Sequence, residues 1–494
     1  MTTPIAPIRK LFIANRAEIA LRIVRTAERM GIQTVVPWHA KDRAGPALAA
    51  ATETVEVFGE PPVAAWLDAQ AMIRAARDSG CDAIHPGYGF LSENAAFAQA
   101  VADAGLVFVG PPAAAIALMG DKISARHFAV RHEVPVTPSA DEADDPATFA
   151  ERARAVGFPL LVKGAAGGGG KGMQIVRRDE DLAAAIETAR GESQRYFGDG
   201  RLFAERFVER PRHIEVQVFG DMHGHVIHLG ERECSIQRRF QKLIEESPAP
   251  GLAPELRERL CSAAVRLCKA AGYVNAGTVE CIVAPGGEFF FLEMNTRLQV
   301  EHPVTEMVTG LDLVELQLRV AQGEPLGLAQ PDVQHAGHAI ECRLLAEDAD
   351  AGFVPDTGRV LLLHAPQGPG VRFDAGVTEG SPVTADFDSL LAKLVVHGAD
   401  RSLAISRMRT ALAETAMLGV TLNSNFLARV LSHPAFARGE TDTGFIERHR
   451  EQLKPAGLTD GQRRALLAVA ASAAPDLSTP RLAEPYASMG AWRN

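Results

Sequence analysis

The chain has 494 residues, of which 47% are hydrophobic and 23% are charged, and its formal net charge is -10. The length predicts roughly three domains of about 150 residues each, and the negative charge argues against non-specific nucleic-acid binding. No apolar run is long enough to span a bilayer, no signal-peptide core is present, and the six cysteines form no C-x-x-C pair. We therefore expect a cytoplasmic protein with reduced thiols and neither a membrane nor a nucleic-acid partner.

Strand and helix patterns alternate along residues 8–120. A short apolar run is followed by a helical segment that ends at Gly31, and then by a second apolar run. The segments that carry this pattern lie at 11–14, 16–31, 33–38, 81–93 and 106–112. This is βαβ organisation, which predicts a parallel sheet that binds ligands at the carboxyl ends of its strands.

A run of glycines separates two apolar segments in "LLVKGAAGGGGKGMQIV", residues 160–176. A Rossmann site requires a helix after the glycines, whereas the apolar, β-branched "MQIV" predicts a strand. A Walker A loop is excluded because Gly172 follows Lys171 where Ser or Thr is needed. A flexible linker and a purely structural hairpin remain alternatives. Because glycine N–H groups can approach phosphate oxygens closely, we favour a phosphate-binding flap between two strands, with Lys163 adding a positive charge.

The segment 277–306 predicts a hairpin whose strands carry facing carboxylates. "TVECIV" and "EFFFLE" are typical of strands, and Gly286 and Gly287 indicate a two-residue turn. With these glycines at the centre, Glu280 lies opposite Glu293, with Cβ atoms roughly 4.5–5.5 Å apart. Two such charges repel each other unless a divalent cation such as Mg²⁺ lies between them. An exposed face with two solvated carboxylates is the alternative.

Polar residues alternate along the chain after Glu293, at Asn295, Arg297, Gln299 and Glu301. Residues two apart share one face of an extended segment, so this row is either a solvated strand face or part of a site. Arg297 could hold an anion in bidentate fashion, and Glu301 would be a base within its reach. Further along, 311–323 and 460–474 predict helices.

Several long motifs, together with these features, resemble the ATP-grasp biotin carboxylases over about residues 8–450. These are the first-step subunits or domains of acetyl-, propionyl- and methylcrotonyl-CoA carboxylases and of pyruvate carboxylase. The motifs are "IANRAEIALRI", "IHPGYGFLSEN", "LMGDK", "RHIEVQVFGD", "ERECSIQRR", "EMNTRLQVEHPVTE", "GHAIECR" and "FDSLLAKL". The resemblance implies an α/β (α+β) ATP-grasp fold with a Rossmann-like N-terminal domain and a mobile glycine-rich lid. The implied parts are an N-terminal biotin carboxylase domain at 1–120, an ATP-grasp domain at 121–335 with its lid at about 137–208, a C-terminal biotin carboxylase domain at 336–450, and a helical tail or linker at 451–494.

The resemblance also implies the reaction, a ligase that carboxylates carrier-bound biotin with bicarbonate and ATP through carboxyphosphate, using Mg²⁺ or Mn²⁺. This is the first half-reaction of an acyl-CoA carboxylase. The family's site residues map onto this sequence as follows: Lys122, Lys163, Gly169 and Gly170 at the ATP phosphates; Glu205, Arg206, Phe207 and Val208 at the adenine, with His213 nearby; and Glu280, Glu293 and Asn295 at the metal ions. Lys242, Arg297 and the backbone of Val300 would bind bicarbonate, Glu301 would deprotonate it, and Arg343 would stabilise the ureido oxyanion of biotin.

The sequence departs from the family pattern in the flap, where Ala166 and Lys171 replace a glycine and an arginine, and at Phe240, where many relatives carry histidine near the ribose. The family's biotinylated Met-Lys-Met turn does not occur in these 494 residues. We therefore expect biotin on another polypeptide or on a longer form of this subunit. The expected partners are a biotin carrier and a carboxyltransferase, within a homodimer or a larger assembly.

Two other functions remain possible at this level. One is an ATP-grasp ligase that acts on a different carboxylate, which "TRLQVEHPVTE" and "GHAIECR" argue against. The other is a catalytically silent ATP-binding scaffold, which the complete set of acidic and basic site residues argues against.

Overall fold

The computed structural model describes residues 7–142, 145–165, 172–457 and 459–473. The chain divides into two units, Met1–Leu453 and Lys454–Asn494. Within the second unit, α16 (Asp460–Ala473) confirms the helix predicted there. None of the described helices is long and apolar enough to cross a membrane.

The first unit begins with a five-stranded parallel sheet in the order β3-β2-β1-β4-β5, which confirms the predicted βαβ organisation. Apolar residues at helical spacing, such as Ile19 and Ile23, bury one face of α1 in the core. The elements of this part are β1 (Lys10–Ile13), α1 (Ala17–Arg29), β2 (Gln33–Trp38), α2 (Pro46–Ala50), β3 (Glu53–Glu56), α3 (Ala69–Asp78), β4 (Ala83–His85), α4 (Ala95–Asp103), β5 (Val107–Phe108) and α5 (Ala113–Gly120).

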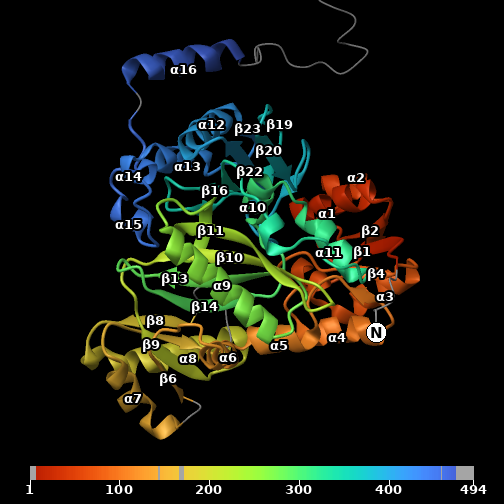
Figure 1. The fold of residues 1–494 in the computed structure, drawn as a ribbon. Coiled ribbons are helices and arrows are strands. Elements are labelled where there is room, and N and C mark those ends of the chain that lie inside the picture. The colour runs from red at the N-terminus through yellow and green to blue at the C-terminus, as the bar shows by residue number, and fades with distance from the viewer. Residues whose placement is uncertain (1–6, 143–144, 166–171, 458, 474–494) are drawn as a thin grey trace, which may run out of the picture. The chain divides into compact units, whose positions relative to one another are not determined.

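A four-stranded sheet in the order β6-β9-β7-β8 forms the lid, drawn in yellow in Figure 1. Strands β7 and β8 pair antiparallel, so the predicted strand on each side of the glycine run is confirmed. Gly169, Gly170, Ala166 and Lys171 lie outside the described residues. The elements are α6 (Lys122–Arg131), β6 (Ser139–Asp141), α7 (Phe149–Val156), β7 (Leu160–Gly164), β8 (Met173–Val176), α8 (Leu182–Phe197) and β9 (Leu202–Arg206).

The central feature is an eight-stranded sheet in the order β14-β13-β10-β11-β12-β15-β22-β20. Helix α9 lies across β10 and β11 (Figure 1), and Ile214, Val216 and Val218 of β10 pack in the core beneath it. Glu215 and Gln217 alternate with these residues and therefore point to the opposite face. Because β12 pairs with β15, residues on both sides of position 335 share this sheet.

The strands of this sheet are β10 (Arg212–Gly220), β11 (Val226–Arg238), β12 (Gln241–Ser247), β13 (Asn275–Val283), β14 (Phe289–Asn295), β15 (His338–Leu345), β20 (Val371–Ala375) and β22 (Leu390–Gly398). The helices around it are α9 (Pro254–Ala270), α10 (His302–Thr309), α11 (Leu313–Ala321), α12 (Arg401–Glu414), α13 (Ser424–Ser432), α14 (Pro434–Ala437) and α15 (Phe445–Arg448). Short strand pairs join β16 (Glu347–Asp348) to β17 (Val354–Pro355), β18 (Gly358–Arg359) to β21 (Pro382–Val383), and β19 (Leu362–His364) to β23 (Ala416–Leu418).

The β13–β14 hairpin confirms that Glu280 pairs with Glu293, but its turn differs from the predicted one. The N–H of Gly287 donates to the carbonyl of Ala284, so Pro285 and Gly286 are the central residues and Gly287, with φ +82°, follows them. Near the turn, the residues of β13 and β14 therefore pair one position away from the predicted register, so that Val283 lies opposite Phe289. An irregularity between Glu280 and Cys281, which leaves Leu292 unpaired, restores the register. The shift caused by the turn and the shift caused by the unpaired Leu292 cancel, so Glu280 still lies opposite Glu293.

Candidate active site

One cavity of about 960 Å³ is lined by residues of the lid, the eight-stranded sheet and the N-terminal part of the chain. Every described residue that the sequence predicts for the site lines this cavity. They are Lys122, Lys163, Glu205, Arg206, Phe207, Val208, His213, Lys242, Glu280, Glu293, Asn295, Arg297, Val300, Glu301 and Arg343. The two predicted glycines, Gly169 and Gly170, lie outside the described residues.

The ammonium group of Lys242 is the centre of the charged part of the cavity. Its Nζ lies 2.5 Å from Glu215 Oε2, 2.9 Å from Glu280 Oε1 and 2.6 Å from Glu301 Oε1. Although burial disfavours the charge, these three carboxylates raise the pKa of Lys242 well above its ordinary value. In return, although burial opposes it, Lys242 and then Arg343 lower the pKa of Glu301. Both groups are therefore charged near neutral pH.

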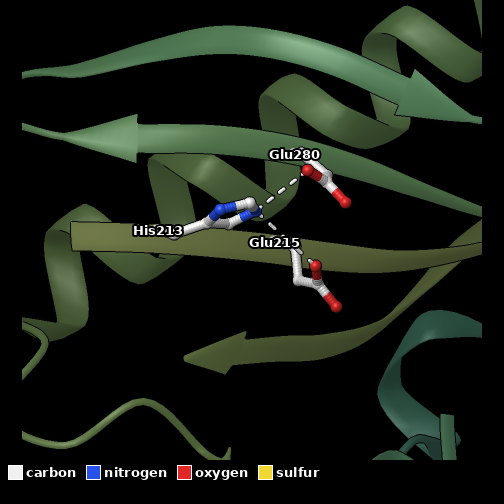
Figure 2. Close-up of side chains that lie close together, drawn as sticks. All are labelled: His213, Glu215 and Glu280. Carbon is white, nitrogen blue, oxygen red and sulfur yellow. Dashed lines mark ion pairs between the residues drawn. The ribbon is translucent and has the colours of Figure 1, made fainter. Parts of the chain in front are cut away.

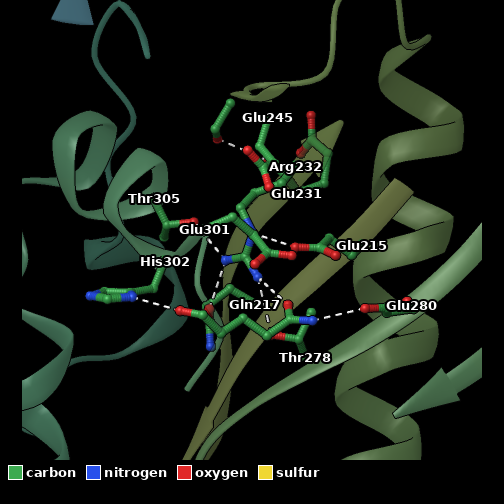
Figure 3. Close-up of polar contacts among 12 residues, drawn as sticks. Glu215, Gln217, Glu231, Arg232, Glu245, Thr278, Glu280, Glu301, His302 and Thr305 are labelled. Atoms are coloured by element: carbon green, nitrogen blue, oxygen red, sulfur yellow. Dashed lines mark hydrogen bonds and ion pairs between the residues drawn. The ribbon is translucent and has the colours of Figure 1, made fainter. Parts of the chain in front are cut away.

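A fully buried arginine, Arg232, donates hydrogen bonds to residues that surround Lys242 and Glu301 (Figure 3). Its Nε donates to Glu215 Oε1 at 2.6 Å, and its two NH groups donate to Gln217 and Gln299 at 2.7 and 2.8 Å. Arg232 therefore fixes Glu215, which in turn contacts Lys242. It also fixes Gln299, two residues before Glu301.

His213 lies beside the same carboxylates, as Figure 2 shows. Its Nε2 is 2.9 Å from Glu280 Oε2 and 3.8 Å from Glu215 Oε2. Although burial opposes it, the carboxylate of Glu280 raises the pKa of His213. The three side chains offer ligand atoms within 4.8 Å of one another. However, Lys242 contacts both carboxylates, so positive charge already balances this group.

The predicted metal ligands are a set of hard oxygen donors. Glu280 and Glu293 are cross-strand neighbours and both line the cavity together with Asn295. Glu293 has a partly exposed side chain and contacts Lys122 Nζ at 3.2 Å, whereas Glu280 accepts hydrogen bonds from Lys242, Asn295 and Gln299. Two carboxylates and an amide beside open space fit the preference of Mg²⁺ for a few protein oxygens plus phosphate.

Arg297 projects from the segment after β14. Its Nε donates to Glu93 Oε2 at 2.9 Å, and one NH group donates to Asn295 Oδ1 at 2.9 Å. The row from Glu293 to Glu301 lines the cavity as predicted, although β14 ends at Asn295 and Glu301 already caps α10. The sequence pattern identified the shared face but not the turn that follows it.

Arg343 reaches the cavity from β15. Its Nε donates to Glu245 Oε1 at 2.6 Å and one NH group donates to Glu301 Oε2 at 2.9 Å. Glu301 thus lies between two cations, Lys242 and Arg343. Burial raises the pKa of Glu245 to about 7, although Arg343 opposes the shift.

At the lid end, Glu205 is held by three donors. Lys163 Nζ lies at 2.5 Å, Arg126 NH1 at 2.7 Å and the Thr137 hydroxyl at 2.6 Å. Despite burial, Lys163 and Arg126 lower the pKa of Glu205 to about 2. Its carboxylate is therefore fully engaged with protein groups.

Phe240 lies at the β11–β12 turn and lines the cavity with 54% of its surface exposed. Arg239 and Phe240 both have positive φ, +48° and +66°, and Arg238 pairs with Gln241. This is the geometry of a type I′ turn, which usually contains Asn and Gly. The phenyl ring cannot donate a hydrogen bond to a ligand in the cavity.

Further residues that were not predicted from the sequence support the site: Glu93, Glu215, Arg232, Glu245 and Lys393. Glu215 could have been found, because it is a charged residue between the apolar Ile214 and Val216 of a strand. The others lie far apart in the sequence, and only the tertiary structure brings them into contact with residues that line the cavity.

Three family models match the chain. "Biotin carboxylase, N-terminal domain" matches residues 7–116, "Carbamoyl-phosphate synthase L chain, ATP binding domain" matches 121–329, and "Biotin carboxylase C-terminal domain" matches 341–448. Together they follow the order of parts that the sequence motifs imply.

Curated relatives show the same likeness. The chain is 45% identical to methylcrotonoyl-CoA carboxylase subunit alpha of Mus musculus over 462 residues, which are 93% of this chain and 64% of that protein. It is 46% identical to the biotin carboxylase of Nostoc sp. over 89% of this chain and 98% of that protein. The chain thus spans less than two thirds of the methylcrotonoyl-CoA carboxylase subunit but matches nearly all of the biotin carboxylase.

Solved structures agree with the sequence relatives. The biotin carboxylase domain dimer of Hydrogenobacter thermophilus 2-oxoglutarate carboxylase, solved with MgADP, ADP and bicarbonate, has a TM-score of 0.89 and 41% identity, covering 92% of this chain and 100% of that one. Biotin carboxylase from Campylobacter jejuni has a TM-score of 0.87 and 41% identity, covering 90% and 99%. The predicted family and ATP-grasp fold are confirmed, and the chain belongs to the biotin carboxylase family.

Proposed function

We propose that this chain carboxylates biotin, using ATP and bicarbonate, in the first half-reaction of a biotin-dependent carboxylase. The observation that carries the proposal is one cavity that is lined by Glu301, by a carboxylate pair and by five cationic side chains predicted for the site. Lys122, Lys163, Lys242, Arg297 and Arg343 all line it, with Glu280 and Glu293 on adjacent strands. A site of this kind suits phosphoryl transfer, where positioning and charge neutralisation dominate.

The nucleotide would lie between the lid and the eight-stranded sheet. Lys122 and Lys163 would neutralise its phosphates, and the segment Glu205–Val208 would meet the adenine through backbone groups, because the Glu205 side chain is already engaged. His213 would lie beside it. Glu280, Glu293 and Asn295 would hold Mg²⁺, which supplies charge neutralisation at the phosphates when bound.

Bicarbonate would lie against Lys242, Arg297 and the backbone of Val300. Glu301 would take its hydroxyl proton, and the bicarbonate oxygen would then attack the γ-phosphorus of ATP as ADP leaves, giving carboxyphosphate. Carboxyphosphate would break down to CO₂ and a phosphate trianion, which removes the N1′ proton of biotin so that N1′ attacks CO₂. Arg343 would stabilise the ureido oxyanion in that step.

Glu301 needs a higher proton affinity for this role than Lys242 and Arg343 allow in the present arrangement. A base works best when its pKa lies near the working pH. We therefore expect the incoming anions to draw Lys242 away from Glu301, which frees the carboxylate to accept a proton. Lys242 would pair with Glu301 in the free protein and bind the anion afterwards, because its flexible side chain carries three N–H donors.

The relatives suggest the wider assembly. A biotin carrier and a carboxyltransferase would be the partners, and copies of this chain would pair, since the Hydrogenobacter thermophilus domain was solved as a dimer. The likeness to methylcrotonoyl-CoA carboxylase subunit alpha favours an acyl-CoA acceptor. A cytoplasmic location and the domain limits at 120, 335 and 450 remain predictions.

ATP cleavage in the presence of Mg²⁺, measured with and without bicarbonate and free biotin, tests the proposal. We expect cleavage that requires bicarbonate and is stimulated by biotin, with carboxybiotin as the product. ATP binding without turnover would favour the scaffold, and turnover with another carboxylate would favour a different ligase.

A further inference from the structure

Lys393 is a completely buried lysine that lies behind the cavity wall and that the mechanism above does not use. It projects from β22, with its Nζ 2.9 Å from the carbonyl oxygen of Val300 and 3.2 Å from Glu18 Oε2. The same Nζ lies 5.9 Å from the centre of the Tyr88 ring. Its contacts thus come from three segments that are far apart in the sequence.

A lysine buried this deeply lowers the stability of the fold unless its charge is compensated by partners. Removing two charges from water costs several kcal/mol each, and a well-packed apolar pair is often at least as stable. Glu18, its ionic partner, is 2% exposed, and burial raises the pKa of Glu18 although Lys393 opposes the shift. The pair is therefore a weak source of stability, which makes the hydrogen bond to Val300 the more informative contact.

The backbone around Val300 is held on both sides. The carbonyl of Val300 accepts from Lys393, and the carbonyl of Gln299 accepts from the ring Nδ1 of His302 at 2.7 Å. Burial, and next the charge of Lys393, lower the pKa of His302, so this ring is neutral and its Nδ1 carries the donated proton. Lys393 and His302 thus fix two successive carbonyl groups of this segment.

The N–H of Val300 is left free by this arrangement. It donates a hydrogen bond to no group within the described part of the chain, and Val300 lines the cavity. The next residue, Glu301, is the N-cap of α10 and contacts Lys242 and Arg343. One short segment therefore presents a free backbone donor and the proposed base side by side.

We infer that Lys393 is a positioning residue that fixes the Val300–Glu301 backbone, so that the Val300 N–H meets bicarbonate while Glu301 reaches its proton. This inference rests on the proposed function. Lys393 contacts no substrate in this role and acts only through the carbonyl of Val300. Loss of Lys393 should therefore affect the use of bicarbonate and leave nucleotide binding intact, because the contacts of Lys122, Lys163 and Glu205 do not involve it.

Lys393→Met tests the inference, since it keeps an unbranched side chain that is only one heavy atom shorter and removes the donor. We expect the KM for bicarbonate to rise and kcat to fall, together about 10²-fold in kcat/KM, because small misplacements of reacting groups cost that much. The Kd for MgADP, measured by calorimetry, should stay within about twofold, a difference of about 0.4 kcal/mol. The double variant Lys393→Met/Glu18→Gln removes the carboxylate that Lys393 contacts, leaves Glu341 and Asp374, which also lie in the field of Lys393, unchanged, and should show the same loss.

Arg401→Met is the matched control. Arg401 forms a buried ion pair with Glu246 and does not line the cavity, so this change removes a similar pair without touching the Val300 segment. It should lower thermal stability and leave the KM for bicarbonate unchanged.

Three results would overturn the inference. One is that Lys393→Met retains the wild-type KM and kcat for bicarbonate. Another is that the double variant regains activity, which would assign the defect to the unpaired Glu18. The third is a parallel loss of MgADP affinity. Wild-type protein without bicarbonate-dependent ATP cleavage would overturn the proposed function as well, so the two failures are distinguishable.

Discussion

Lys242 Nζ lies 2.6 Å from Glu301 Oε1, so the proposed base of the reaction is ion-paired in this structure with a residue proposed to bind its substrate. The contact keeps both side chains charged and in place, but it also lowers the proton affinity of Glu301. For the proposed reaction we therefore expect the pair to separate when anions bind.

Glu301→Gln should abolish bicarbonate-dependent ATP cleavage, because the amide keeps the shape of the side chain but cannot accept the proton. Nucleotide affinity should stay close to wild type, since Glu301 contacts Lys242 and Arg343 rather than the residues proposed for the nucleotide. Turnover assays and equilibrium binding of ADP measure the two effects. Glu315→Gln, on the surface of α11, is the control, and a collapse of nucleotide binding in Glu301→Gln would show that its role is assigned wrongly.

Lys242→Met should destabilise the protein by roughly 3–5 kcal/mol near pH 8, because it leaves three buried carboxylates without their shared cation. The loss of this cation raises the pKa values of Glu280 and Glu301, which Lys242 lowers in the wild type. The folded variant therefore binds more protons than the folded wild type, and its stability relative to the wild type falls as pH rises. Urea unfolding of both proteins in Mg²⁺-free buffer at pH 5 and pH 8 should show a larger difference at pH 8, and an equal difference at both values would contradict the argument.

Glu205→Gln should lower stability at neutral pH by about 3 kcal/mol, since the pKa of Glu205 is lowered from 4.5 to about 2. A carboxyl group with a lowered folded-state pKa contributes stability above its unfolded pKa, and this contribution is lost as pH falls from about 4.5 toward 2. Chemical unfolding along a pH series should therefore show the variant and the wild type converging in acid. A constant difference down to pH 2.5 would refute the assigned cause.

Glu293→Gln should weaken the Mg²⁺ dependence of nucleotide binding while leaving Mg²⁺-free ADP binding nearly unchanged. Glu293 has the more exposed carboxylate of the pair and its only ionic partner among the described residues is Lys122. We expect the Mg²⁺ concentration for half-maximal activity to rise at least about tenfold. Calorimetry of ADP with Mg²⁺ and with EDTA provides the measurement, and equal losses in both buffers would place Glu293 outside the metal site.

The part of the site that could be predicted from the sequence consists of residues that lie close together along the chain. The carboxylate pair follows from one hairpin, and the polar row from Glu293 to Glu301 follows from alternation along a single segment. Even there, local pattern misplaced the turn by one residue, because glycine pairs suit several turn types and a bulge in a strand has no clear sequence signal. The predicted pairing of Glu280 with Glu293 is still correct, because the bulge shifts the register back by one residue.

The sequence alone determined the family and supplied the residue types on which the proposed reaction depends, because long motifs in a fixed order carry them. Only the tertiary structure shows which charged residues contact and position the site residues. Arg232, Glu245 and Lys393 come from different strands of one sheet, and their contacts with Gln299, Arg343 and Val300 depend on strand order and depth of burial. Strand order across a sheet is set by the packing of the whole core rather than by local pattern, and burial is what makes each of these charges need its partner.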